Sequence, residues 1–124
     1  MQKLNQFYIK SLVKKALDED LKPRGDITTK LIKFKNKKVK AQIIAKQNGV
    51  ISGLNFCKTA FKLVGKETVF VSKVKDGSKV KKNKAIAEIK AKTKTILIAE
   101  RTALNFLNHA SGISTLTNLF VQRV

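Results

Sequence analysis

Apolar residues recur at helical spacing along three stretches of the chain. Residues 5–17 place apolar side chains three or four positions apart with lysines between them, which predicts an amphipathic helix. A second helix is predicted to open at Ser52-Gly53, run to about Val64 and end at Gly65. A third helical pattern begins at Thr95. The apolar positions of the first helix are Phe7, Ile9, Leu12, Val13, Ala16 and Leu17.

The third helical pattern continues to the C-terminus, and its length requires an interruption. One straight helix from Thr95 to Val124 would be about 43 Å long, more than the roughly 30 Å span of a small domain. Ser111 is a suitable N-cap and Gly112 a weak helix former, so we predict a break there and a second helical segment after it. The pattern is still running at Val124, and we expect the sequence to be truncated.

Runs between these helices predict strands. Residues 39–45 alternate in the manner of a half-buried strand, and two further strand-like runs cover 68–74 and 85–91. The connection between the last two runs contains Asp76-Gly77 and is rich in turn residues, which is typical of antiparallel neighbours.

The composition fits one compact domain. A chain of 124 residues that is 43% hydrophobic can bury one core. Its one cysteine, Cys57, excludes an intramolecular disulfide, and the apolar surroundings predict a buried, unreactive thiol. The one histidine, His109, has no second histidine or cysteine with which to share a metal. The N-terminus lacks a signal peptide and a membrane span, so we expect a cytosolic protein without a membrane partner.

The charge is strongly positive, with 27 basic and 8 acidic residues and a formal net charge of +19. Such an excess points to anionic partners, and the lysine-rich runs 30–40 and 73–84 could contact a nucleic-acid backbone. However, 24 of the basic residues are Lys, as coding bias would produce, and the chain has seven Phe, one Tyr and no Trp to stack on bases. A solvated lysine surface is the favoured interpretation, with nucleic-acid binding as the alternative.

Glu100-Arg101 interrupts an otherwise apolar stretch. Because the chain uses Arg three times against 24 Lys, an Arg at this place suggests that the planar guanidinium fork is required. The fork pairs bidentately with a carboxylate or phosphate of a ligand, or else forms an internal ion pair with Glu100 or Asp26. Asp18-Glu19-Asp20 could bind a cation, although consecutive acids at a helix end are usually solvated. No P-loop, dinucleotide-binding or zinc-protease signature is present.

Several motifs follow one another in a recognisable order. They are Asp18-Glu19-Asp20-Leu21, Gly25-Asp26-Ile27-Thr28-Thr29, Ala45-Lys46-Gln47-Asn48-Gly49-Val50-Ile51-Ser52-Gly53, Asp76-Gly77-Ser78-Lys79-Val80, the run Ile96–Leu107 with Glu100-Arg101-Thr102-Ala103-Leu104-Asn105-Phe106-Leu107, and Ser111-Gly112-Ile113-Ser114-Thr115. The chain closely resembles, from about residue 12 to 122, the N-terminal part of nicotinate-nucleotide pyrophosphorylase (carboxylating), also called quinolinate phosphoribosyltransferase.

The resemblance implies a fold and an activity. The implied fold is an α+β, α/β-hammerhead domain, an open sandwich of a mainly antiparallel sheet and helices. The implied reaction converts quinolinate and phosphoribosyl pyrophosphate to nicotinate mononucleotide, CO₂ and pyrophosphate with Mg²⁺, in de novo NAD biosynthesis. In the family, the arginine of the Glu-Arg-Thr motif binds a quinolinate carboxylate in the partner subunit's active site. Arg101 occupies that position, and with it the resemblance favours the ligand contact over the ion pair.

The resemblance also implies a domain organisation. Residues 1–110 are expected to form the hammerhead domain, and residues 111–124 to start the connection to an absent C-terminal α/β-barrel. That barrel carries the family's metal-binding and phosphate-binding residues, so we expect no catalytic residue and no metal ligand in this chain, and no activity of the chain alone. A homodimer, a higher homo-oligomer or a separate barrel-bearing chain would complete it. The alternatives are a lysine-rich nucleic-acid-binding module on the same fold and a molybdate-operon relative of the family.

Overall fold

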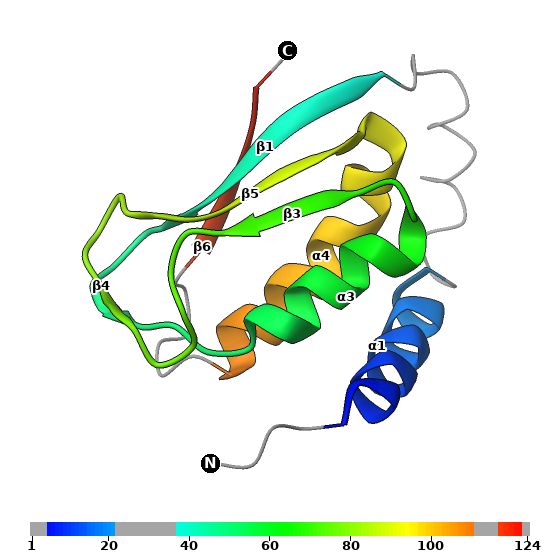
Figure 1. Cartoon of the computed structure of the whole chain (residues 1–124), viewed down its shortest axis with the longest axis horizontal. Coiled ribbons are helices and arrows are strands. Elements are labelled where there is room, and N and C mark those ends of the chain that lie inside the picture. Colours follow the sequence, from blue (N-terminus) through cyan, green and yellow to red (C-terminus); the bar gives the residue numbers. More distant parts are fainter. Residues whose placement is uncertain (1–4, 22–36, 111–116, 123–124) are drawn as a thin grey trace.

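The computed structural model describes residues 5–21, 37–110 and 117–122 (Figure 1). Three helices lie in these ranges: α1 (Gln6–Leu21), α3 (Leu54–Val64) and α4 (Thr93–Ala110). The strands there are β1 (Lys38–Ala45), β2 (Gly49–Val50), β3 (Val69–Ser72), β4 (Lys79–Val80), β5 (Ala85–Lys92) and β6 (Thr117–Gln122). The predicted helices and strands up to Ala110 are therefore present at nearly the predicted positions.

The main sheet is open and antiparallel, with strand order β3-β5-β1-β6, and β2 and β4 form a small second pair. Helices α3 and α4 pack against each other beneath the main sheet, and α1 packs on both of them (Figure 1). This confirms the predicted α+β architecture with an open antiparallel sheet. The strand pairing is non-local, because β1 separates two strands that follow it in the chain.

Alternation along β1 and β5 determines which face of the sheet is buried. Every second residue of β1 from Val39 to Ala45 is buried, and the register sets Ala41 opposite Ile89. The alternation fails at Ile86, which is buried together with Ala87. A register shift at this point gives β5 one residue more than β1, so that consecutive side chains can both enter the core.

Helix α3 begins and ends at glycines, as predicted. Gly53 precedes it with φ 91° and supplies no capping side chain, and Asp76 Oδ1 instead accepts a hydrogen bond of 3.1 Å from the Leu54 N–H. Gly65 ends the helix, donating its N–H to the Phe61 carbonyl at 2.9 Å. A Cβ on Gly65 would lie only 2.6 Å from Thr95 Oγ1, so this glycine permits α3 and α4 to approach closely.

Helix α1 is longer than predicted and its buried face is narrower. Ile9, Val13 and Leu17 are buried one turn apart, whereas the expected apolar position Phe7 is 81% exposed. The helix continues to Leu21, so the acidic run Asp18-Glu19-Asp20 lies within its last turn.

The C-terminal segment corrects the sequence prediction. The predicted helical continuation beyond Gly112 is wrong at residues 117–122, which form β6 and pair antiparallel with β1. The run Leu119-Phe120-Val121 suits a strand as well as a helix, and short apolar runs do not distinguish the two by periodicity. Strand pairing favours the strand here. β1 pairs with β5 along one edge, and the backbone N–H and C=O groups of its other edge need hydrogen-bonding partners, which β6 supplies. The boundary expected at residue 110 stays a prediction, although β6 joins the sheet of the preceding residues.

Candidate functional site

Arg101 lies on the outward side of α4. The inward side of this helix is formed by Ile96, Ala99, Ala103 and Leu107, all of which are buried, whereas Arg101 is exposed. Among the described residues, Arg101 forms no ion pair. Asp26, the other expected partner, lies outside the described residues. The guanidinium is thus presented to the surroundings of the domain.

The neighbours of Arg101 on α4 are partly exposed and mostly apolar. Leu97 and Ile98 lie about one turn before it and Leu104 one turn after it, and all three are half-buried. Asn105, four residues after Arg101, is exposed on the same side. This part of α4 therefore presents a cation and an amide among half-buried apolar side chains. Such a surface is suited to contact another protein around a polar ligand.

Directly after Arg101, Thr102 joins α4 to α1. Thr102 is 1% exposed, and its hydroxyl donates a hydrogen bond of 2.5 Å to Asp20 Oδ2 on α1. Asp20 is half-buried, while Asp18 and Glu19 are exposed. The acidic run is therefore not uniform, because two of its members face solvent as expected and the third contacts the arginine-bearing helix.

The acidic run does not form a metal site within the described structure. No group of three or more His, Cys, Asp or Glu side chains suited to hold a metal ion occurs among the described residues. Asp20 is already engaged by Thr102. The described residues thus do not fit the Mg²⁺ that the resemblance implies.

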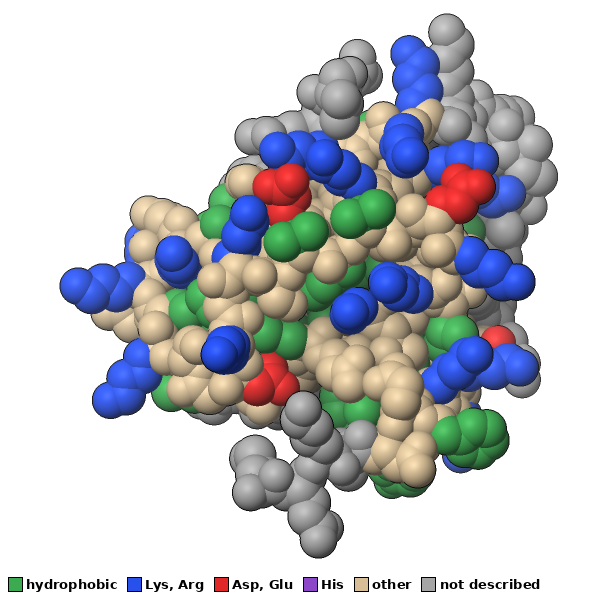
Figure 2. All heavy atoms as spheres, viewed as in Figure 1, with side chains coloured by type: hydrophobic (Ala, Val, Ile, Leu, Met, Phe, Trp, Pro, Cys, Tyr) green, Lys and Arg blue, Asp and Glu red, His purple; other side chains and the backbone are tan. Residues whose placement is uncertain are grey.

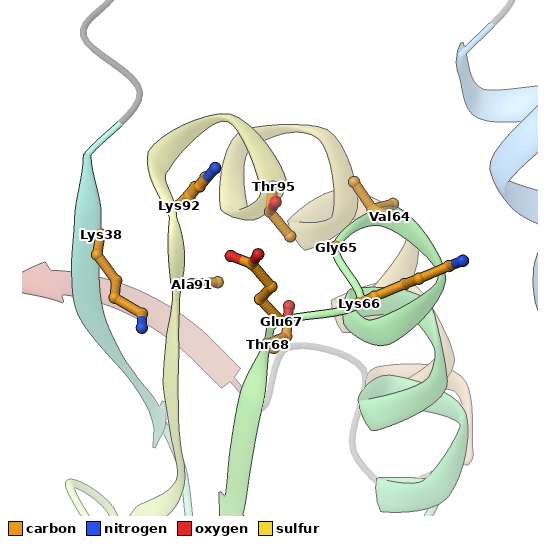
Figure 3. A pocket seen from close by; sticks show the side chains of 9 residues that line it. All are labelled: Lys38, Val64, Gly65, Lys66, Glu67, Thr68, Ala91, Lys92 and Thr95. Atoms are coloured by element: carbon orange, nitrogen blue, oxygen red, sulfur yellow. The ribbon is translucent and has the colours of Figure 1, made fainter.

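A cavity of about 280 Å³ opens at the end of the sheet, between the start of α4 and the end of α3 (Figure 3). Lys38, Lys66 and Lys92 line it, but Figure 3 shows the Glu67 carboxylate pointing into its centre. A carboxylate at this place opposes the binding of an anionic ligand. Arg101 is not among the lining residues, so the cavity and the arginine are separate features.

Basic side chains are spread over the face of the molecule that contains β3 and α3 (Figure 2). On the outer side of the sheet, Lys40 forms an ion pair of 3.3 Å with Glu88, and the Lys40 backbone is opposite Lys90. The exposed aromatic residues Phe7 and Tyr8 lie on α1, away from this sheet. The lysines of the run 73–84 are exposed, whereas residues 30–36 of the other lysine-rich run lie outside the described residues. Among the described helices, none is both long and apolar enough to cross a bilayer.

Cys57 is buried in the core, as predicted. Its exposed fraction is zero, and burial away from water raises the pKa of its thiol well above the ordinary range. The thiolate required of a nucleophile is therefore disfavoured at this position.

The sequence of the chain matches a known protein family. The match to the "Quinolinate phosphoribosyl transferase, N-terminal domain" family covers residues 26–111. The chain belongs to this family. The match contains the Gly25–Thr29 motif in part and the whole Glu-Arg-Thr motif, so the family resemblance inferred from the sequence is confirmed.

Individual members of the quinolinate phosphoribosyltransferase family resemble the chain over most of its length. A probable nicotinate-nucleotide pyrophosphorylase (carboxylating) of Methanocaldococcus jannaschii is 38% identical over 94% of this chain and 39% of its own length. Quinolinate phosphoribosyltransferase (decarboxylating) 1b of Nicotiana tabacum is 33% identical over 88% of this chain and 31% of its own length. The crystal structure of NadC from Streptococcus pyogenes superposes with a TM-score of 0.78 at 31% identity, covering 88% of this chain and 39% of that one.

The chain thus spans 31% to 39% of the length of these family members. The motif Gly25–Thr29 and the motif Ser111–Thr115 fall wholly outside the described residues, and so does the side chain of His109.

The sequence identified Arg101 as a candidate site residue, but it did not reveal the hydrogen bond between Thr102 and Asp20 beside it. Asp20 and Thr102 are 82 positions apart, and only the folded structure brings them together. Each belongs to a motif that carried the resemblance, which was the available signal. The role of Asp76 at the start of α3 was missed for the same reason, because 22 positions separate it from Leu54.

Proposed function

We propose that this chain is the N-terminal part of an enzyme that transfers a phosphoribosyl group from phosphoribosyl pyrophosphate to quinolinate, forming nicotinate mononucleotide, CO₂ and pyrophosphate. In this proposal Arg101 binds a carboxylate of quinolinate in the active site of a partner subunit. The observation that carries the proposal is the outward position of Arg101 on α4, without an ion-pair partner among the described residues, in a chain of this family.

The chemistry of the substrate favours an arginine at this place. Quinolinate is a pyridine with two adjacent carboxylates, and a rigid forked donor binds a carboxylate through two parallel hydrogen bonds. Arg101 emerges from a helix that is fixed on its opposite side by buried residues. Its half-buried neighbours Leu97, Ile98 and Leu104 would be covered when a second subunit docks, and the water around the guanidinium would then be displaced. Desolvation strengthens the charge pair.

The proposal assigns the remaining chemistry to residues outside the described structure. One arginine cannot supply the positioning and charge stabilisation that phosphoribosyl transfer requires. The Mg²⁺ would bind outside the described part of this chain, which has no suitable carboxylate cluster. We therefore expect the purified 124-residue chain to form no nicotinate mononucleotide from quinolinate, phosphoribosyl pyrophosphate and Mg²⁺. Clear product formation by the chain alone would contradict this assignment.

The decisive experiment replaces Arg101 in the complete enzyme, with the barrel present. Arg101→Ala should weaken quinolinate binding by about 2–5 kcal/mol, because a desolvated carboxylate loses its charged partner. Arg101→Lys keeps the charge but loses the fork, and should recover only part of the affinity. Lys62→Ala, which removes an exposed cation from α3, is the matched control for net charge and should leave kcat/KM unchanged. An unchanged KM and kcat/KM for quinolinate in Arg101→Ala would refute the role.

The assembly and the compartment belong to the same proposal. A homodimer or higher homo-oligomer, or a separate barrel-bearing chain, would bring Arg101 to a neighbouring active site. The cytosolic compartment expected from the sequence stays a prediction, since some of the similar plant proteins are named as mitochondrial or chloroplastic. Neither the nucleic-acid-binding alternative nor the molybdate-operon relative gains support from a particular feature of the described structure.

A further inference from the structure

Two segments far apart in the sequence meet beside Arg101, and their contact fixes the helix that carries it. We propose that Asp20 and Thr102 are positioning residues, whose hydrogen bond sets the rotation of α4 and thereby the direction in which Arg101 points. The inference rests on the proposed function, because it assigns a task to residues next to the proposed quinolinate contact.

The hydrogen bond is a directional link between α1 and α4. Thr102 is 1% exposed and donates over 2.5 Å to a carboxylate oxygen of Asp20. A bond to a charged acceptor is shorter and stronger than one between neutral groups, and a buried hydroxyl that loses its partner carries a desolvation penalty. The link therefore resists small rotations that would lengthen it.

The packing of α4 and the hydrogen bond at Thr102 act on the same side of the helix. This buried side is formed by Ile96, Ala99, Ala103 and Leu107. Thr102 is next to Ala103 on this side, and Arg101 is one residue earlier, about 100° away around the helix. A hydrogen bond at Thr102 therefore controls the orientation of Arg101 through the rigid backbone between them.

Asp20 occupies a position that helix energetics alone would not favour. It lies in the last turn of α1, where the helix macrodipole disfavours a negative charge. The rest of α1 is anchored independently, since Ile9, Val13 and Leu17 are buried and Gln6 Nε2 donates to Thr59 Oγ1 at 3.1 Å. The carboxylate is thus held by a firmly placed helix and engages α4 beside Arg101.

The expected effect on KM follows from how far a rotation of α4 moves the Arg101 side chain. At the outer surface of the helix, about 6 Å from its axis, a rotation of roughly 10° displaces a side-chain atom by about 1 Å. A displacement of about 1 Å at a substrate-positioning group can cost up to about 100-fold in activity. We expect Thr102→Val in the complete enzyme to raise the KM for quinolinate about tenfold, while the KM for phosphoribosyl pyrophosphate stays within about twofold.

Conservative variants separate positioning from general stability. Thr102→Ser retains the hydroxyl and should restore the KM to within about threefold of the parent value. Asp20→Ala should raise the KM as Thr102→Val does, and the double variant should be no worse than either single one, since both remove the same bond. Ile96→Val removes a buried methyl group from the same helix, and serves as the control with a similar loss of stability and an unchanged KM.

The same series includes Arg101→Ala, so that the two ideas can fail separately. If Arg101→Ala raises the KM for quinolinate and Thr102→Val and Asp20→Ala behave like Ile96→Val, the positioning role is overturned and the proposed function stands. If Arg101→Ala leaves the KM unchanged, the proposed function is refuted and the positioning role with it. A quinolinate-specific KM increase in both positioning variants, reversed by Thr102→Ser, supports the inference.

Discussion

Replacing Gly65 by alanine tests how closely α3 and α4 approach. The backbone of Gly65 has φ −136° and ψ 106°, an extended conformation that any residue adopts, so the new side chain brings no conformational strain. Its Cβ, however, would lie 2.6 Å from Thr95 Oγ1 and 2.8 Å from Thr95 Cγ2, inside van der Waals contact. Thr95 is itself buried, so it has little room to move.

The magnitude follows from two opposing terms. Overpacking of a close contact costs about 1–3 kcal/mol, while the loss of glycine's freedom in the unfolded chain stabilises by about 0.4–1 kcal/mol. We therefore expect Gly65→Ala to lower the free energy of unfolding by about 1–2 kcal/mol. In a domain of this size, that corresponds to a fall in Tm of roughly 3–8 °C.

A double-mutant cycle with Thr95 identifies the cause. Thr95→Ala removes both close atoms and leaves a contact of 3.2 Å to Thr68 Oγ1, so in this background Gly65→Ala should cost less than about 0.5 kcal/mol. Gly77→Ala is the matched control, because Gly77 has φ 89° and no atom within 4 Å of the added Cβ. It should destabilise through backbone strain by about 1 kcal/mol, equally in both backgrounds. Urea unfolding of the parent, the two single variants, the double variant and Gly77→Ala in both backgrounds measures these values. An equal cost of Gly65→Ala with and without Thr95 would refute the reasoning.

Three further predictions concern the start of α3 and the core. Asp76→Ala should lower the free energy of unfolding by about 0.5–2 kcal/mol, since the Leu54 N–H loses its acceptor. Asp76→Asn keeps an acceptor oxygen and should cost less. Denaturant titration measures both values, and two variants as stable as the parent would contradict the prediction. Cys57 should resist a thiol reagent in the native protein at pH 8 and react in urea, and rapid stoichiometric labelling of the folded chain would argue against its burial. Because burial raises the pKa of Cys57 in the folded state, its contribution to stability should be complete below the ordinary value of 9.0 and decline as the pH rises above it, where the unfolded thiol ionises.

Local patterns were sufficient for most of the secondary structure up to Ala110. The helix α3 was bounded correctly because Gly53 and Gly65 mark its ends in the sequence itself. The helix α1 was predicted too short, since it continues through the acidic run to Leu21, and Phe7, which was assigned to its apolar face, is exposed. Periodicity gives the face of a helix but not the width of the surface that covers it.

The strand β6 could not be predicted from local sequence patterns. Residues 117–122 suit a helix or a strand, and the choice depends on β1, which lies more than 70 positions earlier. The bulge at Ile86 has the same origin, because it becomes visible only when β5 is aligned with β1.

The sequence alone determined the family, the α+β class and the residue that is proposed to meet the substrate. It could do so because motif order, periodicity and the rare use of arginine are properties of the chain itself. Only the tertiary structure decided that Arg101 faces outward without an ion-pair partner among the described residues, and that Thr102 and Asp20 hold the helix beside it. Hydrogen bonds and burial depend on which distant segments come into contact, and that information exists only once the chain has folded.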